Sequence, residues 1–280
     1  MGNTPHINPP FGTYALPPKR EALRAARSPI SHTRIGRWGI SSQRKRAIRG
    51  LTEPFDVQVA FGVKARLYPS TNRCEKRAFC GVEIWDPIER AELRDAITVS
   101  PDKTFVFLDI GANVGLYSLF AHSYAQQAGR DIRIIAVEPS SDMSARLTVN
   151  AAASGAKIEH IQTAISTQAG EVFLSDGGRN RGEGQISDSG EAVTAMTLMQ
   201  LCEQENVTRI DSLKLDIEGV DLAVLTQFFE QAPETLHPRL MILELDANSA
   251  APLIELTQAH AYLILKRTRM NVVMRKRDRT

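Results

Sequence analysis

The sequence is poor in the residues that build disulfide frameworks and membrane spans. Three of its 280 residues are cysteines, Cys74, Cys80 and Cys202, and they form neither a Cys-x-x-Cys pair nor an even set. We therefore expect reduced thiols. No apolar run approaches the roughly 20 residues that cross a bilayer, and the first residues lack the apolar segment of a signal peptide. These absences lead us to expect a cytoplasmic protein without a membrane span.

Charge is unevenly distributed along the chain. Residues 1–50 contain ten Lys and Arg against one acid, Glu21, and residues 261–280 contain seven against Asp278. An acidic body therefore lies between two basic ends, which could bind nucleic acid or an acidic surface. No interleaved aromatics or RNA-binding signature accompany the charge. The sequence favours solvated ends, and an RNA-binding or RNA-modifying protein stays as an alternative.

The chain divides into three parts by composition. Residues 1–50 are rich in Pro, Arg and Ser and predict a flexible N-terminal extension. Residues 51–98 predict a hairpin around Gly62 and a helix that begins at Asp86-Pro87-Ile88-Glu89 with Asp86 as its cap, both packing on the core. Residues 99–280 form the third part, in which strand and helix patterns alternate.

This alternation predicts the fold class. Strands are expected near 104–109, 132–138, 157–162, 211–217 and 239–245, and helices near 114–128, 140–153, 197–206, 219–230 and 250–260. Two short runs, 262–265 and 271–274, predict a closing antiparallel pair. Such a pattern is typical of a doubly wound, mostly parallel seven-stranded α/β sheet with helices on both faces. The Gly- and Ser-rich stretch 175–190 predicts a long loop.

The stretch FVFLDIGANVGLYS, residues 105 to 118, combines a buried strand, a glycine turn and a helix. Asp109 ends the strand, and Gly111 and Gly115 have the spacing G-x-x-x-G, whereas dinucleotide-binding folds use G-x-G-x-x-G. A carboxylate beside the turn disfavours a phosphate ligand. It suits S-adenosylmethionine, which carries a sulfonium and an ammonium group. The alternative is a tight turn that needs glycine for backbone reasons alone.

Further acids follow the next strands. Glu138 ends the second strand, 23 residues after Gly115, close to the spacing at which an acid binds ribose hydroxyls. The spacing also occurs in nicotinamide enzymes. Asp216 and Glu218 end the fourth strand and would both face a cofactor cleft, although Glu218 could instead cap the next helix. Glu244 and Asp246 form a weaker pair of the same kind.

Methyl transfer to an alcohol would need a base, because an aliphatic hydroxyl is a poor nucleophile. The histidines fall in the N-terminal extension (the leader, residues 1–50), in predicted helices or away from the predicted cleft. Asp216 is therefore the first candidate and Glu218 the second. We assign no metal site, although these two carboxylates could alternatively hold a divalent ion.

Three segments resemble the FkbM-type methyltransferases: FLDIGANVGLYS, AVEPSSDMSARLTVNAAASG and SLKLDIEGVDLAVL. The resemblance implies a class I methyltransferase, Rossmann-like fold and O-methylation of a hydroxyl on a small molecule, such as a sugar or secondary metabolite, or on a glycan. Asp216 and Glu218 match the acidic motif of the family. A non-catalytic cofactor-binding module remains a rival interpretation. By resemblance, S-adenosylmethionine would be bound by Asp109, Gly111, Ala112, Asn113, Gly115, Glu138 and Pro139.

Overall fold

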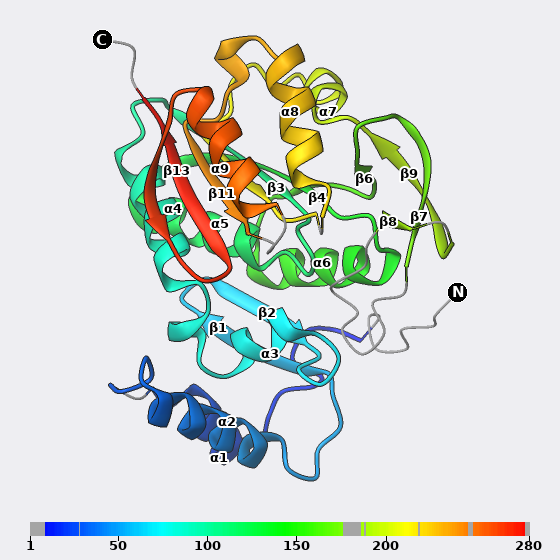
Figure 1. Cartoon of the computed structure of the whole chain (residues 1–280). Helices are drawn as coiled ribbons and strands as arrows, with labels where there is room; N and C mark the ends of the chain where they lie inside the picture. Colours follow the sequence, from blue (N-terminus) through cyan, green and yellow to red (C-terminus); the bar gives the residue numbers. More distant parts are fainter. Residues whose placement is uncertain are drawn as a thin grey trace.

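The computed structural model in Figure 1 describes residues 9–27, 29–175, 186–187, 189–217, 219–245 and 249–277. Its central element is a seven-stranded sheet. In spatial order the strands are β12 (Tyr262–Arg267), β13 (Asn271–Lys276), β11 (Leu240–Glu244), β10 (Ser212–Leu215), β3 (Thr104–Ile110), β4 (Asp131–Val137) and β5 (Glu159–Ile161).

The pairings show a doubly wound sheet. Every pair from β11 to β5 is parallel, and β13 runs antiparallel to both β11 and β12. The chain order reverses between β3 and β10, so the carboxyl ends of these strands border the crevice in which such sheets bind ligands. The predicted mostly parallel, seven-stranded fold is confirmed.

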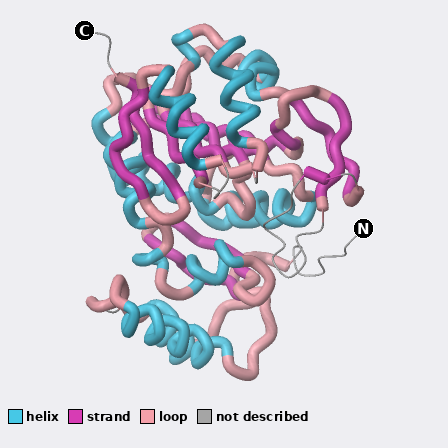
Figure 2. The backbone as a smooth tube through the Cα atoms, in the orientation of Figure 1, coloured by secondary structure: helices cyan, strands magenta, loops and turns pink. Residues whose placement is uncertain are grey.

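Helices cover both faces of this sheet (Figures 1 and 2). One face carries α4 (Pro87–Val99), α5 (Leu116–Ala128) and α6 (Ser141–Ser154), and the other carries α7 (Leu198–Gln204), α8 (Asp221–Gln231) and α9 (Ala250–Ala259). Each face has its own apolar core. A short 3-10 helix, η2 (Glu234–Leu236), precedes β11. Among the described helices, none has the length and apolar character needed to cross a bilayer.

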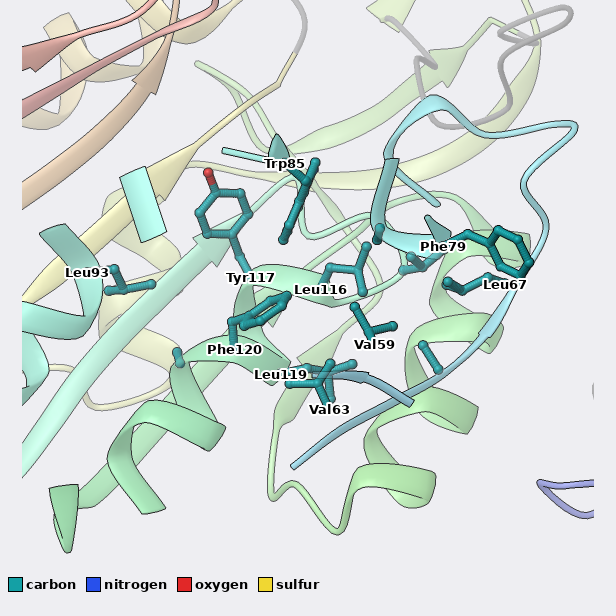
Figure 3. Packing of buried hydrophobic residues seen from close by; sticks show 14 of the residues in the cluster. Val59, Val63, Leu67, Phe79, Trp85, Leu93, Leu116, Tyr117, Leu119 and Phe120 are labelled. Atoms are coloured by element: carbon teal, nitrogen blue, oxygen red, sulfur yellow. The ribbon is translucent and has the colours of Figure 1, made fainter. Parts of the chain in front are cut away.

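An N-terminal layer packs beneath α5 and α6 (Figure 1). It consists of α1 (Pro18–Ala25), α2 (Arg34–Ile48), the antiparallel pair β1 (Phe55–Ala60) and β2 (Val63–Leu67), α3 (Arg73–Phe79) and the 3-10 helix η1 (Val82–Ile84). Figure 3 shows how Val59, Val63 and Leu67 of the hairpin join Leu116, Leu119 and Phe120 of α5 in one buried cluster. The hairpin thus extends the core of the sheet.

Within the first fifty residues, the described segments 9–27 and 29–50 pack on the hairpin layer, which their composition does not predict. Leu16, Ile40 and Ala47 are buried in the core cluster that contains the hairpin. The Arg24 guanidinium is 5% exposed and donates to the carbonyl oxygens of Phe79 and Gln58. Composition misses this docking because a few apolar residues and one buried arginine hold the segment in place.

A small second sheet was also not predicted. It contains β6 (Ala164–Ile165), β9 (Glu191–Met196), β7 (Gly170–Leu174) and β8 (Ile186–Ser187), in that order. Of the predicted loop 175–190, residues 176–185 and 188 lie outside the described part of the chain, and 186–187 form a strand. The strands β6 and β8 have two residues each, which is too short to leave a periodic pattern in the sequence. The strands β7 and β9 are longer but mostly exposed, so they lack the apolar run of a buried strand.

Candidate active site

A cavity of about 130 Å³ lies at the carboxyl ends of β3, β10 and β11. Two segments far apart in the sequence close it, the α3 region and the turn between β12 and β13. The residues that line it are Asn72, Arg73, Cys74, Arg77, Trp85, Asp86, Gly111, Ala112, Asn113, Leu116, Tyr117, Lys214, Asp216, Glu244, Met270 and Asn271. This set brings together Gly111, Ala112, Asn113 and Asp216 from the sequence prediction.

The glycine turn is shaped by close contact with β10. Gly111 has φ +75°, and a Cβ atom there would lie 1.9 Å from the carbonyl oxygen of Asp216. A side chain at this position would therefore collide with backbone. Asn113 also has a positive φ, 52°, and its Oδ1 accepts from Asn72 Nδ2 at 2.8 Å and from the Val114 N–H. The turn is thus tied to α3 as well as to the sheet.

Asp109 lies beneath this turn and is 0% exposed. Its Oδ2 accepts hydrogen bonds from the backbone N–H and the hydroxyl of Ser118, which fixes the first turn of α5. Its buried Oδ1 has no hydrogen-bond partner. Burial raises the pKa of this carboxyl, although Lys214 opposes the effect. Asp109 does not line the cavity, so the contacts of this acid favour positioning of the turn and of α5.

Glu138 bridges the ends of β3 and β4. Its carboxylate accepts from the Asn113 N–H at 2.8 Å and from the Ser140 N–H at 2.9 Å, and the residue is 8% exposed. Burial raises the pKa of Glu138 to about 7, against the lowering effect of these two N–H groups. Glu138, the adjacent half-buried Pro139, and Gly115 stand outside the cavity described above.

Gly115 has a packing function that its spacing alone does not reveal. It precedes α5 with φ +81°, and a Cβ atom would lie 2.8 Å from Leu147 Cγ of α6. The residue therefore allows α5 and α6 to approach each other beside the glycine turn. This is the backbone explanation weighed for the two glycines, and it applies most directly to Gly115.

Lys214 is a buried cation that the sequence analysis did not select. It pairs in register with Asp109 of β3, and its Nζ lies 2.7 Å from Asp216 Oδ2. Burial lowers the pKa of Lys214, but Asp216, Asp109 and Glu244 outweigh this effect and hold it above its usual range. The sequence does contain a signal for Lys214, because it is a charged residue in the strand SLKL, whose apolar neighbours predict burial.

Asp216 is the predicted catalytic residue that reaches the cavity. Burial favours its neutral form, but the ammonium group of Lys214 outweighs this, so the pKa of Asp216 falls below its usual range. Its side chain remains 35% exposed. Asp216 is therefore ionised and is a weak proton acceptor. Glu218 and Asp246, the other members of the two predicted acid pairs, lie outside the described residues.

Asp86 is the second residue that sequence reasoning missed at this site. It occupies the predicted N-cap position of α4, but its side chain makes no capping hydrogen bond. Instead, Oδ2 accepts from the Tyr117 hydroxyl at 3.1 Å, and the backbone has φ 42°. Burial, reinforced by Glu89, raises the pKa of Asp86. The capping prediction is wrong for the side chain because a tertiary partner 31 residues away binds it.

The aromatic wall beside Asp86 is formed by Trp85 and Tyr117. Their ring centroids are 5.2 Å apart in an edge-on arrangement, and both side chains are visible in Figure 3. Lys214 Nζ lies 5.1 Å from the centre of the Tyr117 ring. The cavity therefore has an apolar wall, the buried cation Lys214 and three carboxylates, Asp86, Asp216 and Glu244. The pKa values of Asp86 and Asp216 are shifted in opposite directions. Such a difference is typical of groups with separate roles in proton transfer.

Solved structures with similar folds are methyltransferases of low sequence identity. The METTL16 methyltransferase domain is 14% identical, with a TM-score of 0.47 and 76% of this chain and 73% of that chain covered. An S-adenosylmethionine-dependent methyltransferase from Agrobacterium tumefaciens is 16% identical, with a TM-score of 0.47 and coverages of 81% and 71%. TrmK from M. capricolum, in complex with S-adenosylhomocysteine, is 11% identical, with a TM-score of 0.37 and coverages of 65% and 67%.

Sequence comparison is more decisive than these structural likenesses. No curated protein matches the chain significantly. The family model of the methyltransferase FkbM domain matches residues 109–264, more than half of the chain, from the end of β3 into β12. The matched segment begins at Asp109 and includes the glycine turn, Glu138, Lys214 and Asp216. The chain belongs to the FkbM methyltransferase family.

Proposed function

We propose that this methyltransferase uses S-adenosylmethionine to methylate a hydroxyl group on a sugar, glycan or secondary metabolite, with Asp86 as the general base. The observation that carries the proposal is the position of the Asp86 side chain, which lines the cavity and leaves its own helix end uncapped. A carboxylate with a raised pKa accepts a proton more readily than an ordinary one, and an alcohol needs such help.

The residues around the glycine turn suit a cationic cofactor. Gly111 leaves no room for a side chain against β10, and Asp109, buried beneath the turn, holds the first turn of α5 in position. Glu138, held by two backbone N–H groups, is the proposed acceptor for the ribose hydroxyls. Gly111, Ala112 and Asn113 would present backbone to the aminoacyl part. When bound, S-adenosylmethionine supplies an electrophilic methyl group.

The side chains that line the cavity have separate roles in this proposed reaction. Asp86 would accept the proton of the acceptor hydroxyl, and the Tyr117 hydroxyl holds the Asp86 carboxylate in place. Asp216, ionised beside Lys214, orients the acceptor through hydrogen bonds from other hydroxyls. This modifies the sequence-based hypothesis, in which Asp216 was the first candidate for the base. For Glu218 the catalytic assignment stays a prediction.

The acceptor class can be tested with labelled cofactor. The protein is incubated with methyl-labelled S-adenosylmethionine and an extract of its own cells, and the labelled product is characterised by mass spectrometry and NMR. A labelled methyl ether supports the proposal. A labelled N-methyl group, for example on a nucleobase, contradicts it, and so does the absence of transfer despite cofactor binding.

With an acceptor in hand, Asp86→Asn tests the base. We expect turnover to fall on the order of 10²–10⁴-fold, because the amide cannot accept the proton, while cofactor affinity stays unchanged. Asp216→Asn should raise KM for the acceptor more than it lowers kcat. Equal turnover in Asp86→Asn and wild type would remove Asp86 from the mechanism, whatever the result for Asp216.

A further inference from the structure

Three large apolar side chains are exposed together at the start of α2. Trp38 is 74% exposed, Ile35 is 73% exposed, and Ile30, in the loop before the helix, is 48% exposed. The opposite face of α2 is buried through Gly36, Ile40 and Ala47. One face of the helix therefore packs on the core, and the apolar residues on the other face stay exposed in the part of the chain that the structure describes.

Cations occupy the same outward face. Arg34, Trp38 and Lys45 are spaced by four and seven residues, so they share one side of the helix, and Ile35 and Arg49 lie beside them at a spacing of fourteen. All five of these residues are exposed. The face of α2 thus mixes cations along its length with an apolar patch at its beginning.

Acids are absent from this face. The helix α2 contains none, and Glu21 is the single acid between residues 9 and 50. Glu21 is itself engaged by Arg24 in a 2.6 Å ion pair. Ten Lys and Arg residues fall in the same segment. The layer formed by α1 and α2, which lies at one end of the molecule in Figure 1, therefore presents concentrated positive charge.

We propose that the outward face of α2, with Ile30, docks on an anionic lipid surface. Tryptophan prefers the boundary between lipid headgroups and acyl chains. Isoleucine gains by leaving water, and Lys and Arg are attracted to anionic headgroups. RNA fits the surface less well, because single strands use aromatic stacking platforms and phosphate contacts, and two exposed isoleucines contribute to neither. The function of this surface is separate from the methyl-transfer site.

The test is sedimentation of the full-length protein with vesicles. One vesicle type is neutral phosphatidylcholine, and the other contains about one third phosphatidylglycerol. We expect binding to the anionic vesicles and weaker binding at high salt. Trp38→Ala should lower the partition coefficient about tenfold. The double variant Arg34→Gln with Lys45→Gln should lower it about 25-fold, because each cation contributes about fivefold.

Matched controls come from elsewhere on the chain. Phe61→Ala removes another exposed aromatic residue, 69% exposed, and Lys266→Gln with Arg267→Gln removes two exposed cations from the other basic end. Both controls should bind vesicles as the wild type does, and circular dichroism should show that all variants are folded. Absence of vesicle binding overturns the proposal. So does equal loss in the controls, or a Trp38-dependent affinity for a single-stranded RNA oligonucleotide without affinity for vesicles.

Discussion

Gly111 is the residue at which backbone geometry most directly limits the site. Its φ is +75°, and a Cβ atom at this position would lie 1.9 Å from the Asp216 carbonyl oxygen, so no other residue fits. We expect Gly111→Ala to abolish cofactor binding and to destabilise the fold by more than the roughly 1 kcal/mol that the φ angle alone costs. Calorimetric titration with S-adenosylhomocysteine and urea unfolding measure the two effects.

Gly129 provides the control for that substitution. It also has a positive φ, +62°, but a Cβ atom there would meet nothing within 4 Å. Gly129→Ala should therefore cost about 1 kcal/mol of stability and leave cofactor affinity intact. If the two variants behaved alike, the contact with Asp216 would have no part in shaping the turn.

The raised pKa of Glu138 leads us to expect that cofactor affinity depends on pH. Burial raises it to about 7, so the free protein holds this group mostly protonated at pH 6 and mostly ionised at pH 8. If the ionised form accepts the ribose hydroxyls, cofactor affinity should rise up to about tenfold between these pH values. Glu138→Gln should bind weakly and with little pH dependence. An unchanged affinity in this variant would take Glu138 out of the cofactor site.

At the scale of elements, α1 is held to the hairpin layer by Arg24. Its guanidinium donates to the Phe79 and Gln58 carbonyls and is almost fully buried. Replacing it with methionine leaves these partners unpaired, and we expect a loss of about 2–4 kcal/mol. The matched variant Arg27→Met changes an exposed arginine in the same segment and should be nearly neutral. Urea unfolding of both variants distinguishes docking from a loosely attached leader.

The parallel sheet could be predicted from the sequence because its signals are local. Continuous apolar strands, glycine turns and amphipathic helices alternate from 104 onward, and their bounds agree with the structure to within a few residues. The leader could not be predicted in the same way. Its attachment depends on Arg24 and Arg66, whose partners lie tens of residues away, and composition carries no record of such contacts.

The candidate site, too, could be predicted from the sequence only in part. Gly111, Ala112, Asn113 and Asp216 stand at strand ends, where topology alone predicts a ligand, and the structure brings them together at one cavity. Asp86 also reaches the cavity, but its sequence context predicts a helix cap. The Tyr117 hydroxyl, which belongs to a different helix, gives the Asp86 side chain another partner. A choice between two partners for one carboxylate is decided by tertiary structure.

At the scale of the whole molecule, the carboxyl groups whose pKa is raised by burial affect stability in the same direction, and in the described part of the chain they are Glu75, Asp86, Asp109, Glu138 and Asp221. Burial raises the pKa of Glu75 and Glu138 to about 7 and that of Asp221 to about 6. In the unfolded chain these groups ionise near pH 4. The folded state therefore binds more protons between about pH 4 and 7, and the stability that these groups contribute is lost as pH rises through that window.

We therefore expect these groups to make the free energy of unfolding larger at pH 5.5 than at pH 8. Glu138→Gln removes one titrating group and should flatten the dependence, as measured by urea unfolding across this range. Glu159→Gln is the control, because Glu159 is exposed and paired with Arg133 at the surface. An equal pH dependence in Glu138→Gln and wild type would show that Glu138 does not titrate in this window.

The ion pair between Asp56 and Arg66 connects the leader to the hairpin, and the hairpin in turn packs on α6, which is made later in synthesis. Asp56 accepts from the Gly12 and Tyr14 N–H groups, and Arg66 donates to the Pro9 and Pro10 carbonyls. The Arg66 N–H in turn donates to Asn150 of α6, 84 residues later. During synthesis at about 5–20 residues per second, the hairpin that receives the leader thus waits on the order of ten seconds for α6. For that interval the basic segment that carries Trp38 and the hairpin that receives it lack the α6 surface, and their exposed apolar side chains would then be open to chaperone binding.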